Sequence, residues 1–345
     1  MKTHTVAELL WMTIPDNQLS KYNQSVTLHP PCLPSRSGGN IPDRKLRQEG
    51  HILKSTKMLA IPLLLMFICF LGYAQSPQSP SSQPDTTGTP DLIVNTDLLS
   101  HQWVVRDEQL AATACSVEEG GITPGLRTII RFTVETPNIG DADIIVGDPN
   151  VHIANNDGLF EFATCHHHYH FRHYALYQLI DPNTGFIWKA AKKGFCMLDT
   201  DPVPTSTGGA PPRSSQFRNC GAIGIPGNQG ISHGWADTYR FFLSGQFFVL
   251  DGGDGQPVVP PGTYIIRITV NPPFKPVAGE PCRFLERIDT DGQPICHQLQ
   301  ESNYSNNVGE ALVTIPDHPG KTGVGPAAGT PAKEDFDEHD NKIPN

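Results

Sequence analysis

A run of three alternating histidines lies at residues 165–170, which read CHHHYH. In an extended segment, side chains alternate between two faces, so His166, His168 and His170 point to one side. A straight strand would hold the outer two about 13 Å apart at Cα, so we expect a bend that brings them together. Neutral imidazoles suit copper, zinc, iron and nickel, and the lack of thiolates disfavours a structural zinc site. The run predicts a metal site, with a metal-free surface histidine cluster as the alternative.

Four further motifs accompany this run. They read PDLIV at 90–94, KKGFCMLDT at 192–200, GWADTY at 234–239 and ESNYSNNV at 301–308. With the histidines, they resemble in type and order the catalytic domain of the lysyl oxidase family, over about residues 90 to 315. A short linker and the lack of additional modules favour a microbial-type member of that family.

The resemblance implies a copper amine oxidase that carries lysine tyrosylquinone, a cofactor made from its own side chains. It places the copper on the three alternating histidines, aligns Tyr239 with the modified tyrosine and aligns Lys192 with the crosslinking lysine, while Lys193 is a near competitor. Taken singly, Tyr239 is as well explained by a hydrogen-bonded core phenol and Lys192 by a solvated charge. Asp237 is the candidate general base because it lies two residues before Tyr239; a loop-capping carboxylate is the alternative.

The implied reaction converts a primary amine, with peptidyl lysine as one candidate, to an aldehyde, using dioxygen and releasing ammonia and hydrogen peroxide. Two readings from other classes stay open: a copper-binding β-sandwich without turnover, and a zinc hydrolase on the same histidines. The pair Lys192 and Tyr239 discriminates between them, since neither alternative needs it. From Gln75 onward the chain has 17 Lys and Arg against 31 Asp and Glu. Such an acidic surface disfavours nucleic acid as a partner and would attract cationic amines.

The resemblance also implies a second metal site, for calcium, because oxygen ligands of this kind suit that ion. Its candidate ligands are Asp91, the carbonyl oxygen of Leu92, Asn303, Asn306 and Asn307. Some family members carry an aspartate where Asn303 stands, so this chain has one charge fewer there.

Six cysteines follow residue 75, and an even number in an exported chain predicts disulfides. The resemblance implies that Cys165 pairs with Cys220 and that Cys282 pairs with Cys296. In the family, further cysteines shortly after the positions of Cys115 and Cys196 serve as their disulfide partners, and this sequence has no cysteine there. These two cysteines are therefore either free or, as we predict, bonded to each other.

The chain divides into five parts by composition. Residues 58–74 read as a signal peptide, since lysines precede an apolar run too short for a stable membrane span, and a membrane anchor is the alternative. Residues 1–57 then read as an over-extended, disordered N-terminus and 75–89 as a Ser/Pro linker. The catalytic domain is expected at 90–316, followed by a disordered tail at 317–345. This layout predicts a secreted, periplasmic or extracellular protein.

The regular segments of this domain read as strands. Tyr264, Ile266, Ile268 and Val270 fall on one face of an alternating run, and Ile130 to Val134 alternate likewise. Residues 176–188 read as a hairpin around a Pro-Asn-Thr-Gly turn. No long helical period is evident, so we expect an all-β fold, an antiparallel β-sandwich with long loops and little helix.

Overall fold

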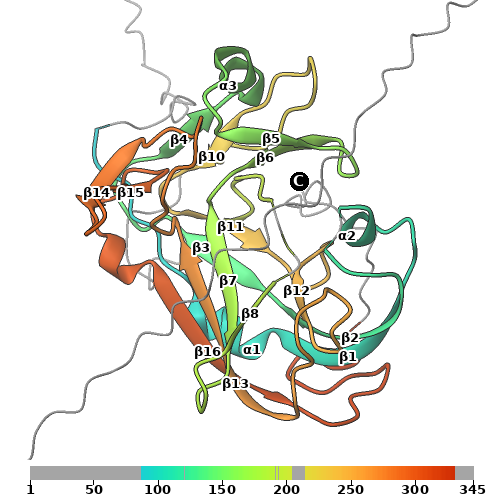
Figure 1. Cartoon of the computed structure of the whole chain (residues 1–345). Coiled ribbons are helices and arrows are strands. Elements are labelled where there is room, and N and C mark those ends of the chain that lie inside the picture. Colours follow the sequence, from blue (N-terminus) through green and yellow to red (C-terminus); the bar gives the residue numbers. More distant parts are fainter. Residues whose placement is uncertain (1–86, 120, 191, 193, 204–213, 331–345) are drawn as a thin grey trace, which may run out of the picture. The chain divides into compact units, whose positions relative to one another are not determined.

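The computed structural model describes residues 87–330 except 120, 191, 193 and 204–213 (Figure 1). The predicted linker, signal peptide and N-terminus up to residue 86 lie outside the described residues. The described part is mostly strand with few helices, which confirms the predicted all-β, antiparallel fold class. No helix among these residues is long and apolar enough to cross a membrane.

Sixteen strands are described, all short. They are β1 (Trp103–Leu110), β2 (Gly125–Phe132), β3 (Val134–Pro137), β4 (Ile144–Gly147), β5 (Phe160–Ala163), β6 (His168–Phe171), β7 (Ala175–Ile180), β8 (Ile187–Lys189), β9 (Asp201–Pro202), β10 (Gln229–Ile231), β11 (Trp235–Tyr239), β12 (Phe247–Val249), β13 (Gly262–Val270), β14 (Phe284–Ile288), β15 (Pro294–His297) and β16 (Val308–Ile315). The helices are α1 (Thr96–His101), α2 (Cys115–Glu118), α3 (Pro149–Asn155) and the 3₁₀ turn η2 (Tyr304–Asn306).

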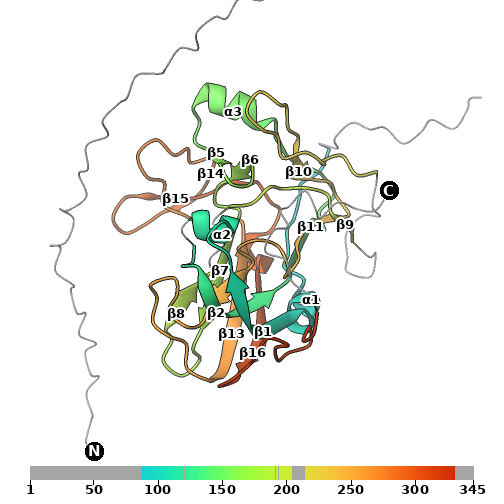
Figure 2. The same cartoon turned by 90° about the vertical axis from the view of Figure 1, so that its right-hand side faces the viewer.

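Two sheets form the sandwich, one in the order β16-β13-β7-β8 and the other in the order β1-β2-β12. Both sheets lie in the lower half of Figures 1 and 2, next to each other in Figure 1 and overlapping in Figure 2. Their inner faces meet in the main hydrophobic core, where the Phe132 ring packs edge-on against Tyr177 at 5.4 Å and stacks on Phe248 at 4.9 Å. A third sheet, β3-β11-β9, continues from β2 through Thr133 and carries the segment that ends at Tyr239.

The predicted strand patterns are present. Along β13, Tyr264, Ile266, Ile268 and Val270 are buried and alternate with half-buried residues, as period two requires. Strands β7 and β8 form the predicted hairpin, closed by a backbone hydrogen bond from Asp181 N to Phe186 O. In β2, by contrast, alternation fails because both faces are covered.

Arg131 shows the consequence of that double cover: its side chain is fully buried. It donates hydrogen bonds to both carboxylate oxygens of Glu108 on β1 and to the carbonyls of Phe241 and Leu243, just after β11. Arg106 contacts the same carboxylate. A buried charge is retained only when it is paired in this way.

The tail corrects a prediction. Although residues from 317 onward were expected to be disordered, residues 320–330 run along the outer edge of β1. Val105 and Val324 exchange two backbone hydrogen bonds, of 2.9 and 2.8 Å, and Ala327 N donates to Trp103 O. An edge strand offers unpaired backbone groups that the backbone of another segment can satisfy, so a tail poor in apolar side chains can still dock there. Residues 331–345 lie outside the described residues.

Candidate metal and cofactor site

The histidine run bends as expected. Only His168 and His170 belong to β6, whose residues pair with β5 in the register Ala163 with His168 and Glu161 with His170. His166 precedes the strand in a tight turn, in which His167 takes a left-handed φ of 58° and donates its N–H to Ala163 O. The ring centroids of His166 and His170 are consequently 5.4 Å apart.

The distances between the three histidine rings are those expected for ligands of one metal ion. The other two centroid distances are 5.6 Å for His166 to His168 and 5.0 Å for His168 to His170. Imidazoles that bind a metal at about 2 Å with near-tetrahedral angles have centroids roughly 5 Å apart. In the described residues, however, no three ligating atoms already surround a common point. The all-imidazole set fits copper or zinc by donor chemistry and spacing, and the rings would have to turn to bind it.

The Lys192 side chain reaches the predicted cofactor tyrosine. Its Nζ lies 4.7 Å from the ring centroid of Tyr239 and 5.1 Å from that of Phe195. The Tyr239 side chain is almost fully buried at 1% exposure, and its hydroxyl donates to Cys196 O at 2.9 Å. Two residues 47 positions apart in the chain are thus brought together. Lys193, the competing lysine, lies outside the described residues.

Backbone contacts join the segment that follows Lys192 to β6, the strand that carries His168 and His170. Phe171, the last residue of β6, donates its N–H to Phe195 O in an antiparallel bridge. Gly194 lies against the His170 ring so closely that a Cβ on it would be 1.9 Å from His170 Nδ1. The candidate metal ligands and the candidate cofactor residues are therefore held on neighbouring backbone segments.

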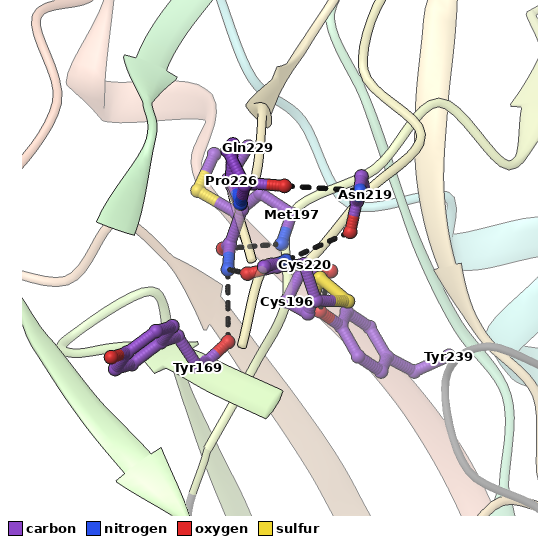
Figure 3. The surroundings of a disulfide bond; sticks show 9 residues. Tyr169, Cys196, Met197, Asn219, Cys220, Pro226, Gln229 and Tyr239 are labelled. Carbon is purple, nitrogen blue, oxygen red and sulfur yellow. Dashed lines mark hydrogen bonds between the residues drawn. A yellow bond between two sulfur atoms is a disulfide. The ribbon is translucent and has the colours of Figure 1, made fainter. Parts of the chain in front are cut away.

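Gln229 on β10 connects these segments further (Figure 3). Its fully buried amide donates to Tyr169 O and Cys220 O, each at 2.9 Å, and accepts from Met197 N at 3.1 Å. One side chain thus joins the histidine strand, the segment after Lys192 and the disulfide-bonded loop. Nothing in the sequence pattern around Gln229 pointed to this role, because its partners are backbone groups from distant segments.

All six cysteines among the described residues form disulfides, but two predicted pairings are wrong. Cys282 pairs with Cys296 as expected, whereas Cys165 pairs with Cys115, and Cys196 with Cys220. The N–H of Tyr169 donates to Gly221 O, so Cys220 lies alongside β6 rather than beside Cys165 in the turn before that strand. Cys165 instead meets the first residue of α2. The predicted Cys115–Cys196 bond is therefore absent.

Asp237 lies on the same face of β11 as Tyr239, two residues along. Its carboxylate is 2% exposed and interacts with the hydroxyl of the buried Tyr174. Burial raises the pKa of Tyr174 well above its usual value, and the Asp237 charge adds to this. Tyr174 also shares a hydrogen bond with Thr136 Oγ1. The general base predicted from sequence is therefore a buried carboxylate with a phenol beside it.

A small pocket opens onto this region. Its walls are formed by Ser116, Glu119, Gly121, His166, His170, Lys192, Gly194, Ser244 and Gly245. Glu119, at the end of α2, was not singled out from the sequence, although it follows Cys115 closely. Burial raises its pKa, but contact with His166 and the charges of His170 and Lys192 outweigh this, so the net pKa is lowered.

The candidate calcium residues are also adjacent. Asn306 donates to both carboxylate oxygens of Asp91 at 3.2 Å, and Asn303 caps η2 through Ser305 N. Asn307 donates to Glu301 Oε1 at 2.9 Å, while Leu92 donates its N–H to Glu301 Oε2. Sequence reasoning missed Glu301, whose buried carboxylate joins Leu92 to Asn307. Burial raises the pKa of Glu301 to about 7 despite these donors.

The molecule is thus a β-sandwich in which a histidine-rich candidate metal site adjoins a lysine packed on a buried tyrosine. The lysyl oxidase family profile matches residues 90–280, more than half of the chain, and the chain belongs to this family. Chicken (Gallus gallus) lysyl oxidase homolog 2 is 26% identical over 232 residues, which cover 64% of this chain and 24% of the relative. Human (Homo sapiens) protein-lysine 6-oxidase is 27% identical over 200 residues, covering 54% and 42% respectively. The chain therefore spans less than half the length of these relatives.

Proposed function

We propose that this protein is a copper-dependent amine oxidase whose carbonyl cofactor is a lysine tyrosylquinone made from Lys192 and Tyr239. The observation that carries the proposal is the 4.7 Å separation between Lys192 Nζ and the Tyr239 ring centroid, beside a cluster of three imidazoles. A copper storage protein or a zinc hydrolase would use the imidazoles but has no use for a lysine held on a tyrosine ring.

His166, His168 and His170 would hold the copper, which supplies the one-electron chemistry needed for dioxygen to oxidise a phenol. The protein's part is to hold the two precursor side chains. The hydrogen bond from Tyr239 to Cys196 O fixes the ring, and the surrounding rings of Phe195 and Tyr174 exclude water from it. Lys192 Nζ, positioned over the ring face, then has a short path to a ring carbon.

The substrate would be a primary amine, with peptidyl lysine as one candidate, which would react with dioxygen and water to give an aldehyde, ammonia and hydrogen peroxide. Asp237 is proposed to accept the proton from the carbon that bears the amine, because it shares a strand face with Tyr239. The predicted signal peptide and the three disulfides support action outside the cytoplasm. The cluster around Asp91 and Asn306 is proposed to hold calcium.

Peptide mass spectrometry of the copper-loaded, aerated protein tests the proposal. The expected result is a single species that joins the peptides containing Lys192 and Tyr239 and that survives reduction of all disulfides. The metal-free protein is the control and should release the two peptides separately. Unlinked Lys192 and Tyr239 in copper-loaded protein that oxidises amines would overturn the proposal, and unlinked residues without turnover would favour a copper-binding protein.

A further inference from the structure

We propose that Glu119 is the positioning residue that orients His166 for copper binding, and that the Cys115–Cys165 disulfide holds Glu119 in place. The proposal rests on the copper site of the proposed function. Its direct observation is a contact of 3.1 Å between Glu119 Oε1 and His166 Nδ1. The His166 side chain is 8% exposed and that of Glu119 is 25% exposed, so the contact is largely shielded from water.

His166 needs such a partner more than the other two histidines do. The backbone of His168 and His170 is fixed by pairing with β5, and their side chains are only 1% and 4% exposed. His166 lies outside that pairing, before the left-handed turn at His167. Its ring direction is therefore set by side-chain contacts rather than by the sheet.

A carboxylate on one ring nitrogen would settle which nitrogen binds the metal. When Glu119 accepts the proton of Nδ1, the imidazole is held in the tautomer that leaves Nε2 available as a ligand. The carboxylate also makes the ring a stronger donor. This arrangement requires Glu119 to be held at a fixed distance from the turn that carries His166.

The disulfide provides that fixed distance. Cys115 is the first residue of α2, and its carbonyl accepts a hydrogen bond from Glu119 N at 2.9 Å. Cys165 immediately precedes His166 and is bonded to Cys115, with Cα atoms 5.4 Å apart. The one-turn helix and the histidine turn are thus joined covalently next to the Glu119–His166 contact. Without the bond, α2 would be a four-residue helix with little intrinsic stability.

Copper binding by the full chain tests the proposal, with Glu118→Gln as the matched control. Glu118 is adjacent, carries the same charge and is exposed, so its replacement should leave the dissociation constant for copper unchanged. Glu119→Ala should weaken copper binding ten- to a hundredfold, the usual effect of losing a residue that orients a ligand. Glu119→Gln should lose less, because its amide oxygen can still accept from Nδ1. If Glu119→Ala does not fold, Glu119→Gln carries the test.

Electron paramagnetic resonance of the copper-loaded variants separates orientation from direct ligation. Glu119→Ala is expected to show fewer coordinated nitrogens than the unaltered protein, because His166 would no longer be held at the metal. An unchanged nitrogen count together with weakened binding would mean that Glu119 is itself a ligand, and would overturn the positioning role. Unchanged affinity in Glu119→Ala would overturn it as well.

The tether is tested with the Cys115→Ser/Cys165→Ser double variant. If the disulfide acts through Glu119, combining this double variant with Glu119→Ala should weaken copper binding no further than Glu119→Ala alone. Additive losses of affinity would show that the disulfide and Glu119 act independently, and would overturn the tethering role. The Lys192–Tyr239 crosslink in the unaltered protein is scored in parallel. A crosslink that forms while Glu119 proves irrelevant refutes this inference alone, and copper binding that depends on Glu119 without a crosslink refutes only the oxidase proposal.

Discussion

Lys192 Nζ lies 4.7 Å from the centre of the Tyr239 ring, although the two residues come from different segments that meet only in the folded domain. The contact has the geometry of a cation over an aromatic face. Two further contacts hold its partners in place. Gly194, two residues after Lys192, packs on the His170 ring, and the Tyr239 hydroxyl donates to Cys196 O. The two side chains that we propose as cofactor precursors are thus already in contact in this structure.

This pair gives the first prediction. Tyr239→Phe should bind copper as the unaltered protein does yet lose all amine oxidation and all reactivity toward hydrazines, because phenylalanine has no ring oxygen from which a quinone can be made. Lys192→Ala should also keep copper but should form no crosslink. Lys189→Ala on β8 is the control, since that lysine is exposed, and it should behave normally. An inactive Lys193→Ala beside a fully active Lys192→Ala would reassign the crosslinking lysine.

His168→Ala should abolish copper uptake and, with it, formation of the crosslink. His168 is the middle member of the triad, and its ring centroid lies within 5.6 Å of both other rings. Its burial at 1% exposure means that no other side chain can easily replace it. Bound copper is measured by elemental analysis, with the exposed His318→Ala as the control. Full copper occupancy in His168→Ala would refute the assignment of this ligand.

Gly194→Ala should impair copper binding although it replaces none of the proposed copper ligands. The added methyl group would lie 1.9 Å from His170 Nδ1, so the ring or the backbone has to move. Overpacking of this kind costs about 1–3 kcal/mol of folding free energy, and the displaced ring should also weaken the metal site. Gly262→Ala is the control, because its nearest atom is 3.5 Å from the added carbon. Copper affinity and denaturant unfolding report the two effects, and equal behaviour of both variants would contradict the prediction.

Glu108→Gln should destabilise the fold at pH 7 but much less in acid. Burial raises the pKa of Glu108, but the charges and hydrogen bonds of Arg131 and Arg106 outweigh this and leave the pKa below its usual 4.5. A lowered pKa in the folded state means that the stabilisation is present above about pH 4.5 and is lost as the pH falls through the folded-state value. Because the change removes the negative charge that compensates the buried Arg131 guanidinium, we expect a loss of about 3 kcal/mol at pH 7.

Urea unfolding at neutral and acid pH measures this difference. Glu310→Gln is the control: its ion pair with Arg267 is exposed on both sides, so its loss should cost less than about 1 kcal/mol. A gap between Glu108→Gln and the unaltered protein that is the same at both pH values would show that the charge of Glu108 does not matter.

The sequence was informative wherever the evidence is local. Period-two alternation identified β13 and placed His166, His168 and His170 on one side of the chain, and turn residues identified the β7–β8 hairpin. The resemblance of the motifs to those of the lysyl oxidase family indicated Lys192 and Tyr239. The strand and turn features, by contrast, depend on residue type and spacing over a few positions, which the chain itself specifies.

Contacts between distant segments were decided only by the tertiary structure. The disulfide partners of Cys115 and Cys196 depend on which loops meet in the folded domain, and the positions of the cysteines in the sequence do not specify this. Gln229 donates to the backbone carbonyl of Tyr169 and Glu119 contacts the ring of His166, and both partners are tens of residues away in the chain. The tail at 320–330 docks through backbone hydrogen bonds and through the close approach of Gly323 and Gly325 to β1, neither of which the apolar pattern of the sequence predicts. Backbone groups are the same at every non-proline residue, so only the folded arrangement determines which of them pair.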